Sequence, residues 1–115
     1  MALTRNSRHT IIERVQRDPA FAVALLNEAA AALRHGEPAV ARLHLRDLVH
    51  ATVSFEGLAT EMNTPSKSLH RMLSARGNPK MDNLAKIFAV LERKLGAVAQ
   101  RTRLGAEAEP EEAPT

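Results

Sequence analysis

The stretch FEGLATEMNTPSKSLHRMLS, residues 55–74, decides how this chain folds. Apolar residues recur at helical spacing in each of its halves: Leu58, Ala59 and Met62, then Leu69, Met72 and Leu73. Asn63 interrupts the first run, and Asn tolerates the left-handed backbone of a turn better than most non-glycine residues. Thr64 is expected to cap the second helix through its hydroxyl, with Pro65 at the first helical position. The stretch therefore predicts two short helices joined by a tight turn.

The outer face of the second helix is polar and basic. Opposite the apolar stripe it carries Ser66, Lys67, His70, Arg71 and Ser74. From Thr64 to Lys80 the chain holds four basic residues and no acidic one: Lys67, Arg71, Arg76 and Lys80. Such a pair is a helix-turn-helix, whose second helix can enter the major groove of duplex DNA. A small helical bundle without DNA affinity can contain the same pair, and the charge favours the DNA-binding interpretation.

Length and composition indicate one all-α domain with a tail. The chain has 115 residues, its apolar residues are mainly Ala, Leu and Val, and only 3% of its residues are aromatic, all of them Phe. The absence of cysteine excludes disulfides and thiol chemistry. No segment approaches the ~18 apolar residues of a membrane span. The start, MALTRNSRH, lacks an apolar signal core, so we expect a cytoplasmic protein with no membrane contact.

The net charge of +3 hides an asymmetry along the chain. Residues 105–115 hold four acidic residues and no basic one. The first 104 residues therefore hold 16 basic residues against 9 acidic ones, a net charge of +7. A folded body this basic is suited to bind a polyanion.

The rest of the chain predicts further helices. One is expected over residues 8–17, a second from Pro19 with Asp18 as its cap until Gly36, and a third from Pro38. Their inward residues are expected to be Ile11, Ile12 and Val15, then Phe21, Leu25, Ala29, Ala32 and Leu33, then Val40, Leu43, Leu48 and Val49. Prolines at three helix starts predict an all-α bundle of five to six helices.

The C-terminal part predicts one more helix and a tail. Ser54 is expected to cap the first helix of the central pair, and Gly77 to end the second in a left-handed conformation. A last helix is expected over residues 82–94, closed by Gly96, with its apolar stripe at Leu84, Ile87, Phe88, Leu91 and Leu95. The chain then divides into an N-terminal support region (1–53), a DNA-binding region (54–96) and a flexible acidic tail (97–115). We expect disorder from about Leu104, because large apolar residues are lacking there.

Residues 55–96 resemble the helix-turn-helix of the lambda-repressor-like (Cro and XRE) family, and most closely the HigA-type antidote proteins of toxin–antitoxin modules. The residues that carry the resemblance are FxxLAxxM at 55–62, SLHRMLS at 68–74, GNP at 77–79 and NLAKIFAVLERKLG at 83–96. His70 stands where tyrosine is usual, and Met81 where a capping threonine or serine is common. The resemblance implies a small bacterial regulator that binds DNA, with neutralisation of a toxin as a weaker analogy.

The candidate DNA-binding residues lie on the second helix of the pair and in the loop after it: Thr64, Ser66, Lys67, Ser68, His70, Arg71, Arg76, Asn78 and Lys80. Lys67 and Arg71 are one turn apart and are expected to reach the groove or its flanking phosphates. Arg76 and Lys80 are expected to contact phosphates, which position a protein without specifying sequence. Ser66, Ser68 and Asn78 equally suit local backbone hydrogen bonds.

The function expected is a sequence-specific repressor that reads the major groove with residues 65–75 as a homodimer. Two alternatives stay open: an antitoxin that neutralises a toxin protein and regulates its own operon, and a helix-turn-helix used only for protein–protein contact. No enzyme is expected, because the sequence lacks catalytic motifs such as HExxH or a glycine-rich phosphate loop. No metal or other cofactor is expected either, since the five histidines show no i, i+3 or i, i+4 pairing.

Overall fold

The computed structural model describes the backbone of residues 3–106 and the side chains of residues 9–96. Over that range the chain forms six α-helices and no strand: α1 (Leu3–Arg17), α2 (Pro19–Arg34), α3 (Pro38–Ala51), α4 (Ser54–Met62), α5 (Ser66–Met72) and α6 (Met81–Ala106). The all-α prediction is confirmed. Within the described range, no helix combines the length and the apolar character that crossing a membrane requires.

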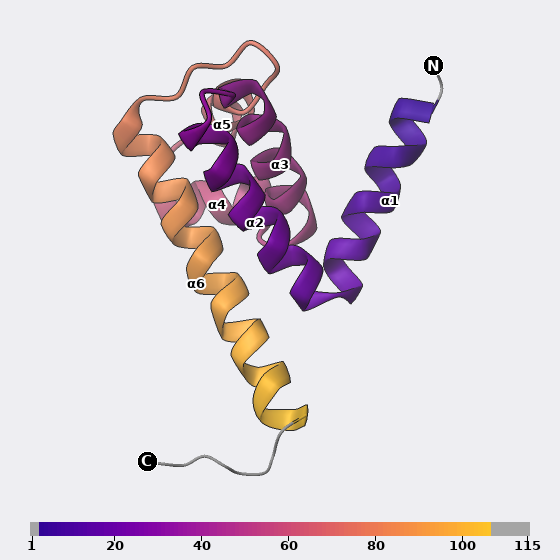
Figure 1. Ribbon diagram of the computed structural model, residues 1–115. Coiled ribbons are helices and arrows are strands. Elements are labelled where there is room, and N and C mark those ends of the chain that lie inside the picture. The colour runs from indigo at the N-terminus through magenta and orange to yellow at the C-terminus, as the bar shows by residue number, and fades with distance from the viewer. Residues whose placement is uncertain (1–2, 107–115) are drawn as a thin grey trace.

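The helices pack around one hydrophobic core (Figure 1). α2 lies between α3 and α6, and α1 turns back from the start of α2 to pack on α3. The short helices α4 and α5 contact each other, and α4 also packs on α3 and α6. Every helix contributes to the buried cluster, whose fully buried large side chains include Leu45, Leu48, Leu58, Leu69, Ile87 and Leu91. The N-terminal helices and the α4–α5 pair therefore share one core, and the division of the chain at residue 54 stays a prediction.

Three local features follow the sequence closely. The Asp18 carboxylate accepts a hydrogen bond from the Phe21 N–H at 3.2 Å, which confirms it as the cap of α2. Ser54, the first residue of α4, accepts one at its hydroxyl from the Gly57 N–H at 3.0 Å, the bond expected of a capping side chain, and its φ is positive (68°). Asn63 has φ 53° and ψ 46°, the left-handed turn conformation expected of it.

Other local predictions are wrong. The Thr64 hydroxyl does not cap α5 but donates to the Met62 carbonyl at 3.0 Å, and α5 begins at Ser66 after Pro65. Gly77 is not in the left-handed region. Glycine suits position 77 for another reason: a Cβ there would collide with the Met72 carbonyl oxygen. The close approach of two backbone segments, and not a positive φ, excludes a side chain at that position.

The last helix is longer than the sequence suggested. α6 begins at Met81 and continues through Gly96 to Ala106, because glycine inside a helix costs only about 1 kcal/mol and the following residues are good helix formers. The predicted flexible tail, residues 97–115, is therefore helical as far as Ala106. Beyond that point it lies outside the described residues.

The buried faces differ from the prediction mainly in α3. Val40 and Leu43 were expected inward but are 40% and 37% exposed, while Ala41 and Leu45 are 1% and 0% exposed. Two apolar stripes run along this helix, and the one at Ala41, Leu45, Leu48 and Val49 faces the core. Smaller differences occur elsewhere: Phe21, Leu33, Met72, Leu84 and Phe88 are only partly buried, and Ala22, Leu26 and Val90 are buried in addition.

Candidate nucleic-acid interface

The turn between α4 and α5 is fixed by backbone hydrogen bonds. The Thr64 N–H donates to the Ala59 carbonyl at 3.0 Å, and the Asn63 N–H donates to the Thr60 carbonyl at 3.3 Å. These bonds satisfy carbonyl groups at the end of α4 that lack a partner within the helix, which the left-handed Asn63 makes possible. The turn therefore sets the direction in which α5 leaves α4.

The orientation of α5 about its own axis is set by two leucines. Leu69 is 0% exposed and Leu73, which follows the helix, is 1% exposed. With these two side chains in the core, Lys67 and Arg71 lie on the exposed side. The predicted recognition helix over residues 65–75 is shorter in the structure, because α5 ends at Met72 and residues 73–76 form turns.

The loop after α5 continues the exposed basic surface. The Ser74 hydroxyl donates to the Arg71 carbonyl at 2.8 Å, and the Gly77 N–H donates to the Ser74 carbonyl at 3.0 Å. Arg76 and Lys80 are exposed in this loop, as is Asn78 between them. The candidate basic residues thus lie on one continuous segment, which we call the basic segment (residues 64–80).

Arg42 on α3 holds the basic segment in place, a role that no sequence pattern indicated. Its Nε donates to the Ser74 carbonyl at 3.1 Å, and its Nη2 donates to the Ala75 carbonyl at 2.9 Å. These carbonyls lie just beyond the end of α5, where a positive charge also interacts favourably with the helix dipole. The two partners are 32 and 33 residues away along the chain, so no local pattern could have identified the contact.

Among the described residues, the charges of the basic segment have no carboxylate partner. In the part of the chain whose side chains are described, no ion pair includes Lys67, Arg71, Arg76 or Lys80. Glu61 on α4 shows the contrast, because it pairs with Arg93 at 2.7 Å and with Lys94 at 3.4 Å. The cations of the basic segment are therefore exposed to solvent and available to an anionic partner.

The remaining candidate residues are more constrained than the sequence suggested. His70 stacks on Phe55 with ring centroids 3.9 Å apart, and His50 packs edge-on against the same Phe55 ring at 4.9 Å. One face of His70 is therefore covered by protein, although the residue as a whole is exposed. Ser66 and Ser68 are partly buried. Thr64 is partly buried too, and its hydroxyl donates its proton to the Met62 carbonyl. Among the described residues, no three potential metal ligands converge.

Comparison with known proteins supplies no relative for this arrangement. No protein-family model matches the chain, and neither the curated proteins nor the solved structures contain a significant match. Its function must therefore be inferred from its own residues and their geometry.

Proposed function

We propose that this protein binds duplex DNA through the basic segment and acts as a transcriptional repressor. The observation that carries the proposal is the arrangement of four exposed cations, Lys67, Arg71, Arg76 and Lys80, on one continuous segment without an ion-pair partner among the described residues. Association with a polyanion is driven largely by such cations, because each phosphate contact releases a condensed counterion.

The two parts of the basic segment have different roles. Lys67 and Arg71 lie on α5, the second helix of the pair, which enters the major groove in a helix-turn-helix protein. Arg71 is suited to bidentate contact with a guanine edge, which would give sequence preference. Arg76 and Lys80 contact phosphates and fix the register of the protein on the duplex. Thr64, Ser66, Ser68, His70 and Asn78 supply short polar contacts around them.

The fold that supports this function is a lambda-repressor-like helix-turn-helix within the six-helix bundle. The left-handed Asn63 between α4 and α5, and the buried Leu69 and Leu73, support it because they turn the polar face of α5 outward. The sequence resemblance of residues 55–96 to that family points the same way.

A homodimer is the proposed active form. One helix of seven residues contacts too few base pairs for useful specificity, whereas two copies related by two-fold symmetry would read a palindrome with half-sites about one helical turn apart. The exposed Val40 and Leu43 on α3 offer an apolar surface for the second copy. The same surface also suits a toxin partner, in which case a gene for a toxin should adjoin the gene for this protein. Sedimentation at micromolar concentration separates a homodimer from a monomer.

The DNA-binding proposal is tested by titrating a fluorescent duplex at several salt concentrations. If Lys67 and Arg71 each contact a phosphate, Lys67→Ala/Arg71→Ala should lower the log–log salt slope by about 0.9 per contact. If Arg71 instead contacts a guanine edge, the difference in binding free energy between the preferred duplex and one with that guanine replaced should fall by roughly 1–3 kcal/mol in the double variant.

The matched control is Arg14→Ala/Arg17→Ala, which removes the same charge from the last turn of α1, at the end of the bundle opposite α5 (Figure 1). Circular dichroism should show an unchanged helix content for both double variants. Equal DNA affinity of wild type and Lys67→Ala/Arg71→Ala would contradict the proposal, as would an equal loss in the control.

A further inference from the structure

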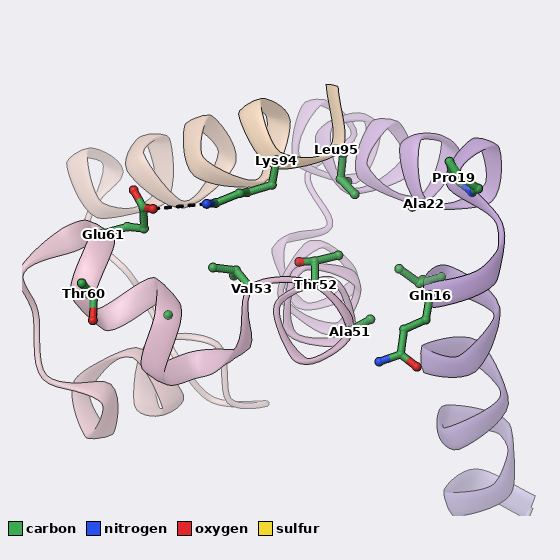
Figure 2. A pocket seen from close by; sticks show the side chains of 12 residues that line it. Gln16, Pro19, Ala22, Ala51, Thr52, Val53, Thr60, Glu61, Lys94 and Leu95 are labelled. Atoms are coloured by element: carbon green, nitrogen blue, oxygen red, sulfur yellow. Dashed lines mark ion pairs between the residues drawn. The ribbon is translucent and has the colours of Figure 1, made fainter. Parts of the chain in front are cut away.

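A cavity of about 670 Å³ opens between the α1–α2 junction, the α3–α4 connection, α4 and α6, and no residue of α5 lines it (Figure 2). Three small residues line this space and leave it open: Ala22, Ala51 and Gly57. Larger apolar side chains form its walls: Val15, Val53 and Leu95. Cavities of this size and character commonly hold small molecules.

The threonines that line the cavity offer no hydrogen-bond donor to a ligand. The Thr52 hydroxyl donates to the Leu48 carbonyl at 2.6 Å, and the Thr60 hydroxyl donates to the Glu56 carbonyl at 3.2 Å. Each hydroxyl has a single proton, which is already used by the helix backbone four residues earlier. The middle of the cavity is therefore suited to a hydrocarbon group.

One end of the cavity carries charge. Figure 2 shows the Lys94 side chain extending toward Glu61 there, while Gln16 and Pro19 lie at the other end. Glu61 accepts a closer contact from Arg93 (2.7 Å) than from Lys94 (3.4 Å). An ammonium group has three donors, so Lys94 can bind a second anion while Arg93 keeps Glu61 paired. Arg93 does not line the cavity, but its contact with Glu61 offsets the carboxylate charge there, which leaves the Lys94 ammonium to favour an anionic ligand over a cationic one.

We infer that the cavity binds an amphipathic carboxylate, such as a medium-chain fatty acid. The hydrocarbon chain lies along Ala51, Val53 and Leu95, and the carboxylate contacts the Lys94 ammonium. This site is separate from the basic segment, so binding of the acid does not depend on the proposed function.

The experiment is a titration of the ¹⁵N-labelled protein with octanoate below its micelle-forming concentration. The chain has only five glycines, whose amide resonances are well separated from the rest, and among the four within the described residues 9–96, Gly57 is the one that lines the cavity. The Gly57 amide should shift and saturate, whereas those of Gly36 and Gly77 should stay in place. Octanol and octylamine, which lack the carboxylate, should bind more weakly.

Two variants locate the ligand within the cavity. Lys94→Gln should weaken octanoate about fivefold, as expected for loss of one partly exposed charge contact. Lys86→Gln is the matched control, since Lys86 lies on the same helix but does not line the cavity. Ala51→Phe should fill the cavity and abolish binding, and a melting curve shows whether that variant is folded.

Three outcomes would overturn the inference: octylamine binding as tightly as octanoate, full affinity in Lys94→Gln, or no saturable shift of Gly57 with millimolar octanoate. A Gly57 shift that depends on protein concentration and not on octanoate would assign the cavity to a second copy of the chain.

Discussion

Helices α3 and α5 each have a proline at their start, yet they differ in how many of their side chains are buried in the core. α3 has 14 residues, of which Ala41, Leu45, Asp47, Leu48 and Val49 are buried. α5 has seven residues, and only Leu69 is buried. A helix of seven residues is unstable in isolation, so α5 depends on its neighbours for its position. The comparison indicates that α3 supplies stability while α5 and its loop supply the surface for a partner, with Arg42 joining the two.

The largest effect is expected from the core of α3. Leu48 is fully buried, so Leu48→Ala should lower the free energy of unfolding by about 2–5 kcal/mol through lost packing and a cavity. Val40→Ala, at a position that is 40% exposed on the same helix, should change it by no more than about 0.5 kcal/mol. Urea unfolding followed by circular dichroism measures both. Equal losses in the two variants would show that the face of α3 is wrongly assigned.

Breaking the link between α3 and the basic segment should have an intermediate effect. Arg42→Met removes both hydrogen bonds to the loop after α5 and should cost about 1–2 kcal/mol of stability, since the contacts are only partly buried. DNA affinity should fall with little change in salt slope, because Arg42 orients the segment and is not expected to contact phosphate.

Arg76→Ala is the comparison variant for Arg42→Met. It removes an expected phosphate contact, so the slope of log DNA affinity against log salt concentration should fall by about 0.9. Arg42→Lys keeps the charge but not the planar two-pronged donor, so it should recover only part of the affinity. An Arg42→Met variant with lowered slope and unchanged stability would make Arg42 a direct phosphate contact instead.

The smallest effect is expected at the turn. Asn63 has a left-handed backbone, which costs a residue with a Cβ roughly 1–2 kcal/mol unless a polar side chain compensates. Asn63→Ala should therefore destabilise by about 1 kcal/mol, and Asn63→Gly should be neutral or slightly stabilising. Denaturant midpoints of the two variants decide the point. If Asn63→Ala proves the more stable, the left-handed conformation is not what the turn requires.

The features that the sequence predicted correctly depend on neighbours within a few residues. The Asp18 cap bonds three residues ahead, the Ser54 hydroxyl does the same, and Asn63 sets its own backbone angles. Residue type and spacing determine such interactions, so these helix starts and the α4–α5 turn could be predicted. The burial of Leu69 and Leu73 followed from periodicity in the same way.

The features that were missed depend on contacts between distant segments. Arg42 reaches carbonyls more than 30 residues away, and Phe55 covers one face of His70 through a stack between α4 and α5. In α3, periodicity allowed two apolar faces, and packing in three dimensions selects the one that includes Leu45 over the one that includes Leu43. The close approach at Gly77 likewise exists only once α5 and its loop are folded.

The most direct test of the central claim is a map of backbone amide shifts in the ¹⁵N-labelled protein on titration with duplex DNA at low salt. We expect the largest shifts between Thr64 and Lys80, together with Arg42, and none at the α1–α2 junction around Asp18. Shifts concentrated on α1 or α2, or no shift at all at saturating DNA, would contradict the claim that α5 and its loop form the DNA-binding surface.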